Sequence, residues 1–534
     1  MEKRWLKQYP EHISAEVSIP DMSLPEMLNE AILNNPKGLA LYFLGEEITY
    51  ETLGELTEAF AAALQGDGFQ KGDRVAIMLP NCPQYVISYY GILKMGGIVT
   101  QVNPMYTANE LTYILKDSGA QAIVIYEPLL PILKKVIDDT SVKRVITVNF
   151  HENAFSGDSA TGFSAFLKTA TRPFYTASIN PGGDIAVLQY TGGTTGRSKG
   201  AMLTHRNLLA NVIQVYEFFK DTLHRGAERF LTVIPLFHVY GMSSCMNLAI
   251  YTESLNILLP RFDVEEVLKT IKTMRPTSFP GVPTMYIALM NHPNVSEYGL
   301  ESITVCNSGS APMPVEKMRT FEAMTGAAIL EGYGLSESSP TTHCNPYFGT
   351  RKPGSVGIGV PSTDYKIVDL ESGTTELPPG EIGEVIINGP QVMKGYWNMP
   401  EETDRTLRNG WLYTGDIAYM DEDGYLYIVD RKKDLIIASG FNVYPREIEE
   451  VLYEHSAVQE AVVVGVPDSY RGETVKAVVV VKDGNDVTED ELIAYCREKL
   501  AAFKVPRIIE FREELPKSSV GKMLRRKIRE ETNI

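Results

Sequence analysis

The sequence predicts an α/β fold with a large N-terminal domain and a small α+β C-terminal domain, and three observations support this prediction. Short apolar segments alternate with helix-like stretches over residues 1–180, which is typical of layered α/β proteins. The strands become short and closely spaced between residues 354 and 429. Beyond a run of five charged residues at 430–434, a further set of strands and a helix follows.

The layered part contains short apolar runs of strand length, separated by segments with helical periodicity. Such runs are expected to be strands that are buried on both faces. The alternation continues beyond residue 180, so we predict stacked α/β layers over most of the N-terminal domain. The predicted strands are 74–79, 122–126, 185–190, 230–234, 303–306 and 328–330.

Residues 354–429 are predicted to form an antiparallel, barrel-like β module. Turn signals separate its strands at Glu371-Ser-Gly373, at Pro378-Pro-Gly380 and at Asp421-Glu-Asp-Gly424. Glycine and proline at this spacing favour hairpin connections.

A boundary between two domains is predicted at Asp430-Arg-Lys-Lys-Asp434. Such a charged run is usually a solvated hairpin turn. Here about a hundred residues follow, with strands at 461–466 and 475–481 and a helix opened by Thr488-Glu-Asp-Glu491, which has capping-box spacing. We therefore expect an N-terminal domain at 1–430 and a C-terminal domain at 431–534.

Composition excludes several classes of protein. Apolar residues make up 44% of the 534 residues and charged residues 22%, which is the balance of a soluble globular protein. The formal charge, 50 − 67 = −17, disfavours nucleic acid as a partner. Five scattered cysteines without CxxC spacing indicate neither a disulfide framework nor a structural zinc site. A reducing, cytoplasmic location is therefore expected.

Membrane association is expected to be peripheral at most. The first residues, MEKRWLKQYPEHIS, carry charge throughout and do not resemble a secretory signal. Runs of about 18 apolar residues, the length that a spanning helix needs, are absent from the sequence.

The strongest local signal is the glycine- and threonine-rich segment from Tyr190 to Gly200, YTGGTTGRSKG. It follows a predicted strand and precedes an amphipathic helix, for which Thr204 is a suitable N-cap. Glycines allow close approach of the backbone to an oligophosphate, hydroxyl and N–H groups donate hydrogen bonds, and Lys199 adds a positive charge. A surface loop is the common alternative for such composition.

A Walker A loop does not fit this segment. That motif needs glycine, four residues and then Gly-Lys-Ser/Thr. Here only three residues separate Gly192 from Gly196, and Lys199 lies two residues too late. A P-loop ATPase or kinase is therefore disfavoured.

The segment resembles the phosphate-loop signature of the adenylate-forming family, which includes acyl-CoA synthetases, luciferases and peptide-synthetase adenylation domains. Further segments resemble that family's motifs in the same order along nearly the whole chain. Within the family the chain looks most like bacterial long-chain fatty-acid–CoA ligases. The matching segments are PLFHVYG (235–241), NSGSAP (307–312), EGYGLSE (331–337), WLYTGD (411–416), DRKK (430–433) and PKSSVGK (516–522).

The resemblance implies a site for ATP and its product AMP. Tyr333, exposed by its Gly-x-Gly frame, would stack on adenine, and Glu337 with Thr195 would bind Mg²⁺. Asp416 would hold the ribose, and Arg431 would support the same sugar or an α-phosphate. The remaining expected nucleotide-binding residues are Thr191, Gly192, Gly193, Thr194, Gly196, Ser198, Gly309, Ser310, Ala311, Glu331, Gly332, Gly334 and Ser336.

The resemblance also implies the catalytic groups. They are Lys199, Glu337, His238 beside the reacting carboxylate, and Lys522, which would stabilise charge as carboxylate attacks the α-phosphate. The C-terminal domain would be mobile and pivot at Lys433. That movement would withdraw Lys522 and present Ser439, Gly440 and Phe441 to coenzyme A. In isolation, His238 would more often be structural and Lys522 part of a solvated basic helix.

We expect a two-step acyl-CoA ligase whose acid is a fatty acid. The segment from Ser278 to Tyr286 and the following Ile287, Leu289 and Met290 resemble the lining of an acyl channel. Tyr240-Gly-Met242 stands where some long-chain members carry a gating tryptophan, so the chain length stays open. An aryl or short-chain acid is the alternative, and a homodimer is compatible with the family.

Overall fold

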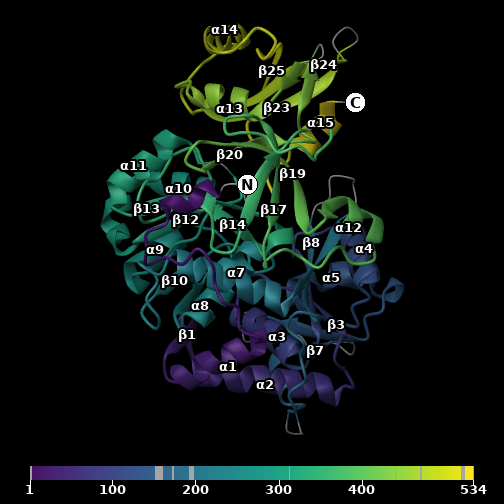
Figure 1. The fold of residues 1–534 in the computed structure, drawn as a ribbon. Helices are drawn as coiled ribbons and strands as arrows, with labels where there is room; N and C mark the ends of the chain where they lie inside the picture. Colours follow the sequence, from purple (N-terminus) through teal and green to yellow (C-terminus); the bar gives the residue numbers. More distant parts are fainter. Residues whose placement is uncertain are drawn as a thin grey trace.

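The computed structural model describes residues 3–150, 160–170, 174–191, 198–311, 313–438, 441–468, 472–518 and 523–532. As the sequence predicts, a large N-terminal domain of mixed α/β layers carries a smaller C-terminal domain, which lies at the top of Figure 1. Among the described residues, no helix combines the length and the apolar character needed to cross a membrane.

The first layer is a seven-stranded sheet with the order β7-β6-β5-β3-β4-β8-β9. All neighbours pair in parallel except β8 and β9, which are antiparallel. The strands predicted at 74–79, 122–126 and 185–190 are confirmed. The strands are β3 (Arg74–Met78), β4 (Ile98–Gln101), β5 (Ala122–Tyr126), β6 (Arg144–Val148), β7 (Thr161–Gly162), β8 (Ile185–Thr191) and β9 (Lys199–Thr204).

The second layer consists of two four-stranded sheets, β10-β11-β1-β2 and β12-β13-β14-β15. Ser278 joins them, because it bridges in parallel to Phe230 of one sheet and Val305 of the other. Strands predicted at 230–234, 303–306 and 328–330 are present with ends shifted by up to four residues. The strands are β1 (Leu39–Phe43), β2 (Glu46–Thr49), β10 (Arg229–Thr232), β11 (Leu255–Leu258), β12 (Val305–Ser308), β13 (Ala328–Gly334), β14 (Thr341–Cys344) and β15 (Ile358–Gly359).

Helix α3 lies in the centre of the N-terminal domain, where it contacts β3 and β4 on one side and α1, α2 and β1 on the other. Every residue from Tyr85 to Lys94 is buried. The α-helices of this domain are α1 (Leu24–Asn34), α2 (Tyr50–Gly66), α3 (Pro83–Lys94), α4 (Ala108–Ser118), α5 (Leu130–Leu133), α6 (Phe163–Leu167), α7 (His205–Phe218), α8 (Leu248–Tyr251), α9 (Val264–Met274), α10 (Pro283–Met290), α11 (Val315–Thr325) and α12 (Pro400–Thr406). The domain also contains the π-helix η4 (Gly241–Asn247) and the 3-10 helices η1 (Arg4–Gln8), η2 (Glu127–Leu129), η3 (Ile137–Asp139), η5 (Val295–Tyr298), η6 (Leu300–Ser302) and η7 (Ser336–Ser338).

The β module is antiparallel, with the order β16-β17-β19-β18 and β20 paired to β19. Gly373, Gly380 and Gly424 have positive φ at the three predicted turns. The module begins at β16 rather than at residue 354, because β15 pairs with β14 in the second layer. Its strands are β16 (Asp364–Val368), β17 (Gly383–Asn388), β18 (Leu407–Arg408), β19 (Trp411–Met420) and β20 (Leu426–Arg431).

The C-terminal domain has its own sheet, β22-β21-β24-β23 with β25 beside β24. The side chain of Thr488 accepts a hydrogen bond from Glu491 N, as the capping-box spacing predicts. The elements are β21 (Ile436–Ala438), β22 (Phe441–Val443), β23 (Val458–Asp468), β24 (Gly472–Val481), β25 (Ile508–Phe511), α13 (Pro445–Tyr453), α14 (Glu489–Lys499) and α15 (Arg525–Thr532).

Candidate active site

The glycine- and threonine-rich loop connects the two strands of a hairpin. Thr191 at the end of β8 pairs with Lys199 at the start of β9. The expected phosphate-loop residues Gly192, Gly193, Thr194, Thr195 and Gly196 lie outside the described residues. Strand β9, which separates the loop from α7, was not predicted from the sequence. Helix α7 begins after the predicted cap Thr204, whose hydroxyl accepts from Asn207 N at 3.1 Å.

The backbone of residues 394–397 extends this hairpin by one further strand-like segment. Gly200 O accepts from Trp397 N at 2.8 Å, and Met202 N donates to Gly395 O at 2.8 Å. Asp117 connects β8 to this segment, because Tyr190 Oη donates to its carboxylate at 2.6 Å and Trp397 Nε1 donates to its carbonyl at 2.9 Å. The loop lysine is thus held by residues about 200 positions away in the sequence.

Lys199, Tyr396, Glu337 and Glu402 form one cluster. Lys199 Nζ lies 2.5 Å from Glu402 Oε2 and 5.1 Å from the centre of the Tyr396 ring. Tyr396 Oη donates to Glu337 Oε1 at 2.7 Å. The hydrogen bond from Lys199 lowers the pKa of Glu402, while burial and the neighbouring Glu337 raise the pKa of Tyr396, so the phenol stays a donor.

The sequence motifs predicted Lys199 and Glu337 of this cluster as site residues, but not Tyr396 and Glu402. The available signals were weak. Pro400 followed by two glutamates is a common start for a helix, and the aromatic pair Tyr396-Trp397 follows a glycine. Neither signal indicates contact with Lys199.

The residues around Glu337 suit a magnesium ion held mainly by phosphate. Groups of three or more His, Cys, Asp or Glu side chains able to hold a metal are absent from the described part of the chain. Mg²⁺ commonly takes one or two carboxylates together with substrate phosphates and waters, and a half-buried carboxylate near the lysine that is expected to bind phosphate fits that pattern. The second expected metal residue, Thr195, lies in the part of the loop that is not described.

Tyr333 and Asp416 are hydrogen bonded across two sheets. Tyr333 Oη donates to Asp416 Oδ2 at 2.6 Å, and Arg431 Nε lies 3.6 Å from Asp416 Oδ1. Burial, followed by the charge of Asp416, raises the pKa of Tyr333. Asp416 was expected after a Thr-Gly turn. It lies instead inside β19, where Gly415 has a positive φ of 71° and the strand continues.

The glycines beside Tyr333 serve backbone packing rather than ring exposure. A Cβ on Gly334 would lie 2.0 Å from Pro340 O, and one on Gly332 would lie 3.3 Å from His343 O. The Tyr333 ring is half-buried, not exposed as predicted, and its centre lies 5.9 Å from that of His343. Ser336 follows in the short turn η7 with Glu337.

The predicted adenine loop follows β12. Ser310 has a positive φ of 67° between Gly309 and Ala311. The buried carboxylate of Glu331 accepts from Met313 N at 3.0 Å, so this side chain anchors the end of the loop. Burial raises the pKa of Glu331 to about 7.

His238 lies in the turn that follows β10. Its Nδ1 accepts a hydrogen bond from Tyr240 N at 3.3 Å. In the neutral ring the proton therefore resides on Nε2. Tyr240 Oη donates to Asn307 O at 2.7 Å, which joins this turn to the adenine loop.

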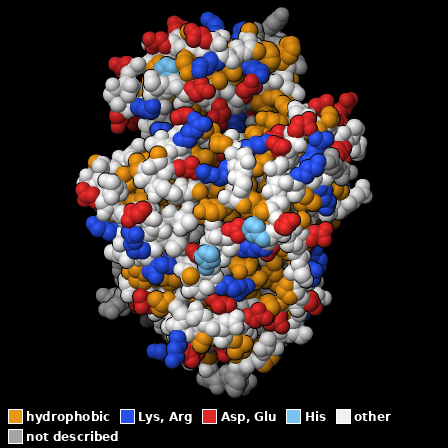
Figure 2. Space-filling model, turned by 60° about the vertical axis from the view of Figure 1, so that its left-hand side comes forward, with side chains coloured by type: hydrophobic (Ala, Val, Ile, Leu, Met, Phe, Trp, Pro, Cys, Tyr) orange, Lys and Arg blue, Asp and Glu red, His pale blue; other side chains and the backbone are white. Residues whose placement is uncertain are grey.

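Charged side chains gather at the junction of the two domains, where an indentation sets the C-terminal domain apart in the space-filling view (Figure 2). Arg525 of α15 lies 2.5 Å from Glu449 and 3.4 Å from the buried Asp430. Arg529 lies 3.0 Å from Asp434. The expected hinge residue Lys433 lies in the turn between these aspartates, and burial lowers its pKa.

The remaining predicted residues are Ser198, Ser439, Gly440, Phe441 and Lys522. Ser439, Gly440 and Lys522 lie outside the described residues. Phe441 is 55% exposed on β22, and its ring stacks on Phe503 at 4.8 Å. Ser198 O accepts from Tyr113 Oη at 3.0 Å.

A narrow cavity opens beside the adenine loop. Val215, Phe219, Phe230, Leu248 and Val305 form apolar walls, and its polar lining residues include Asn307, Thr341, Glu228 and Thr277. Of the segment predicted to line an acyl channel, Ser278 and Pro280 line this cavity, whereas Met285, Tyr286 and Leu289 pack in the core.

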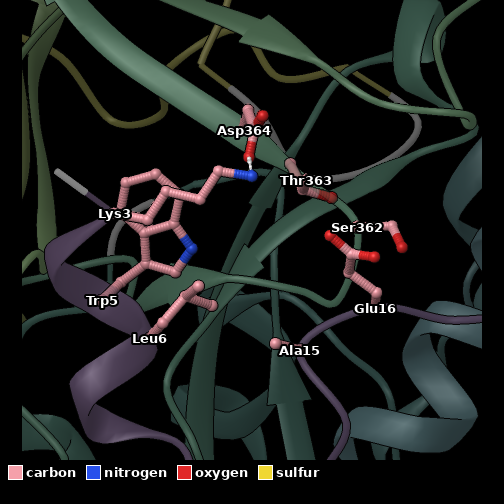
Figure 3. A pocket seen from close by; sticks show the side chains of 8 residues that line it. All are labelled: Lys3, Trp5, Leu6, Ala15, Glu16, Ser362, Thr363 and Asp364. Carbon is pink, nitrogen blue, oxygen red and sulfur yellow. Dashed lines mark ion pairs between the residues drawn. The ribbon is translucent and has the colours of Figure 1, made fainter. Parts of the chain in front are cut away.

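A second cavity, of about 160 Å³, lies near the N-terminus and contains none of the motif residues. Figure 3 shows the ammonium group of Lys3 directed at Asp364, at 2.6 Å, beside Trp5 and Thr363. This ion pair fastens the N-terminal segment to the β module.

Comparisons with known proteins identify the family of this chain. A family model for AMP-binding enzymes matches residues 28–397, and the model for their C-terminal domain matches residues 447–522. A long-chain-fatty-acid–CoA ligase of Bacillus subtilis (strain 168) is 49% identical over 99% of this chain and 98% of its own length. One from Escherichia coli O157:H7 is 42% identical, with the same coverage.

Solved structures resemble this chain over nearly its whole length. ATP-bound MatB from Rhodopseudomonas palustris is 33% identical and superimposes with a TM-score of 0.86, covering 96% of this chain and 99% of its own. The matched models, the relatives and the superposition all extend over nearly the complete sequence. The chain therefore belongs to the AMP-binding enzyme family.

Proposed function

We propose that this protein is an ATP-dependent fatty acid–CoA ligase. In the first half-reaction a carboxylate oxygen of the acid attacks the α-phosphorus of ATP, and pyrophosphate leaves with its bonding electrons. In the second, the thiol sulfur of coenzyme A attacks the acyl carbon, and AMP leaves while the thiol proton is released. Adenylation thus replaces the poor leaving group of the free acid with AMP, which is a good leaving group.

The narrow cavity is the observation that carries the choice of a fatty acid. Its walls are mostly apolar, which suits an alkyl chain, and its lining includes Asn307 of β12, in the adenine loop motif, and Thr341 of β14. Its volume is about 40 Å³, so the walls have to move apart before an alkyl chain can enter. An acid whose chain occupies the cavity would have its carboxylate beside the proposed nucleotide site. The names of the bacterial relatives support the same substrate class.

Charge stabilisation in the first step is assigned to the residues around the phosphate loop. Lys199 would face the phosphates from the start of β9, and Lys522 would approach the α-phosphate from the C-terminal domain. Glu337, with Thr195, would hold Mg²⁺, which when bound neutralises phosphate charge. His238 would orient the acid through the proton on Nε2, and Tyr333 would stack on adenine between Asp416 and the loop at Gly309.

The second step is assigned to a different orientation of the C-terminal domain. We take residues 431–534 as the moving part and Lys433 as its pivot. The contacts of Asp430 with Arg525 and of Ile428 O with Arg446 Nη1 cross this pivot, so they have to change when the domain turns. Phe441, exposed on β22 next to Gly440, would then flank the path of coenzyme A.

Pyrophosphate release from a panel of acids tests the proposal. The panel runs from acetate through benzoate to palmitate, each with and without coenzyme A. Turnover is expected for aliphatic acids of medium or greater length, with thioester formed only when coenzyme A is present. Turnover confined to benzoate or acetate would replace the fatty-acid assignment with an aryl or short-chain acid, and adenylation itself would stand.

A further inference from the structure

Tyr396 contacts both groups that the proposed function assigns to phosphate and metal, Lys199 and Glu337, and Glu402 contacts the first of them. We propose that Tyr396 is a positioning residue that orients Glu337 for the metal ion, and that Glu402 is the counter-ion that holds Lys199 until ATP replaces it. The inference rests on the proposed binding of Mg·ATP. It adds two residues and an order of events to that function.

The position of Tyr396 is fixed from two sides. Its backbone bridges to Ala201 of β9, and its N–H donates to Thr403 Oγ1 at 2.8 Å. The side chain is buried, with 7% of the residue exposed. A phenol held this firmly fixes Glu337 Oε1 at 2.7 Å, which directs the second carboxylate oxygen and reduces the orientational entropy that metal binding has to overcome.

The same ring supports Lys199. The ammonium group lies 5.1 Å from the ring centre, within range of a cation–π interaction. Its side chain is only 12% exposed, and an ammonium so shielded needs a counter-charge. Glu402 supplies that charge in the absence of nucleotide, and a triphosphate provides the same charge when it binds.

Glu402 is also paired with a second cation, and this pair remains when Lys199 moves to the phosphate. Arg405, one turn along α12, donates from Nη1 to Glu402 Oε1 at 3.0 Å. The carboxylate therefore stays paired after the exchange. The ion pair between Lys199 and Glu402 opposes ATP binding, because it has to break before the lysine can reach the nucleotide.

The test combines Mn²⁺ as a probe for the metal with α,β-methylene-ATP as a nucleotide that does not react. Mn²⁺ binding to the full-length protein is followed by electron paramagnetic resonance. Tyr396→Phe removes only the hydroxyl and is expected to weaken Mn²⁺ binding roughly ten- to hundredfold, the effect of one lost hydrogen bond to a charged group that binds the metal. Tyr413→Phe is the matched control, because this tyrosine donates to Gly373 O at 2.9 Å beneath Arg408, and it is expected to bind Mn²⁺ like the wild type.

The second arm measures nucleotide affinity by calorimetry. Glu402→Gln removes the competing charge and is expected to tighten α,β-methylene-ATP binding by about two- to fivefold, the range for a partly exposed ion pair. Glu401→Gln, its exposed neighbour, is the control and is expected to have no effect. Thioester formation from preformed octanoyl-adenylate should be unchanged in the two control variants, Tyr413→Phe and Glu401→Gln.

Unchanged Mn²⁺ affinity in Tyr396→Phe, or unchanged or weaker nucleotide binding in Glu402→Gln, would overturn the inference. If Tyr396→Phe does not fold, the nucleotide affinity of Glu402→Gln alone tests the inference. Failure of the wild-type protein to bind the nucleotide with Mn²⁺ would instead contradict the proposed function, so the two failures are distinguishable.

Discussion

Tyr333 Oη lies 2.6 Å from Asp416 Oδ2, so the residue proposed to face adenine and the residue proposed to bind ribose are held by one hydrogen bond. Tyr333 belongs to β13 of the second layer and Asp416 to β19 of the β module. The bond therefore fixes the distance between two sheets at the nucleotide site. Movement of one residue displaces the other.

A double-mutant cycle with Tyr333→Phe and Asp416→Asn should reveal this coupling. Hydrogen bonds to charged groups contribute about 1.5–3 kcal/mol, and neighbouring residues give non-additive effects. We expect each single variant to lower kcat/KM for ATP about tenfold, and the double variant to lose less than the product of the two. The measurement is pyrophosphate release at varied ATP concentration. Strictly additive losses would contradict the coupling.

Glu331 should make stability depend on pH. Burial raises its pKa from 4.5 to about 7, so the folded protein retains a proton that the unfolded chain releases between these values. Stability is therefore fully present below pH 4.5 and declines as pH rises toward 7, by on the order of 3 kcal/mol. Glu331→Gln retains the acceptor for Met313 N and should raise the thermal midpoint at pH 8 but not at pH 4.5.

The control for this experiment is Glu316→Gln, since Glu316 is an exposed glutamate on α11. It should leave the pH profile of thermal unfolding unchanged. A Glu331→Gln protein with the same pH dependence as the wild type would show that another group carries the effect.

Local patterns in the sequence were sufficient for much of the fold. Strands β3 and β5 are continuous apolar runs, and the caps at Thr204 and Thr488 follow from the chemistry of a helix start. Contacts between distant segments were not predictable in this way. The strand-like segment 394–397 pairs with β9 across about 200 residues, and no local periodicity encodes such pairing.

The same difference between local patterns and long-range contacts applies to the proposed site residues. Motifs identified Lys199, Glu337 and Tyr333, whose neighbours in sequence belong to the same site. Tyr396 and Glu402 enter it only through tertiary packing. The Thr-Gly pair before Asp416 suggested a turn, because Gly415 has the φ of one, but pairing on both sides with β17 and β20 continues the strand.

Val305→Phe should shorten the acids that the protein accepts. Val305 lines the narrow cavity, and a phenyl group there would block a long alkyl chain. We expect the preference in pyrophosphate release to shift from palmitate toward octanoate, with KM for ATP retained. Met324→Phe, at an exposed position on α11, serves as control. An unchanged chain-length profile would place the acyl chain elsewhere.

Lys522→Ala should separate the two half-reactions. The residues on either side are tethered, because Met523 bridges to Lys517 and Leu524 N donates to Pro516 O at 2.9 Å, while Arg525 pairs with Glu449. We therefore expect Lys522 to reach the nucleotide in only one orientation of the C-terminal domain. Removal of its charge should reduce acyl-adenylate formation by more than 100-fold, about 3 kcal/mol of transition-state stabilisation.

Thioester formation from preformed acyl-adenylate should remain close to the wild-type rate, because the second step uses the other orientation. Quenched-flow assays of each half-reaction provide the measurement. Lys527→Ala is the matched control, since Lys527 is exposed on α15 within the same basic segment, and both its rates should be unchanged. Equal loss of both half-reactions in Lys522→Ala would mean that the lysine serves a single arrangement of the domains, and the alternation about Lys433 would have to be abandoned.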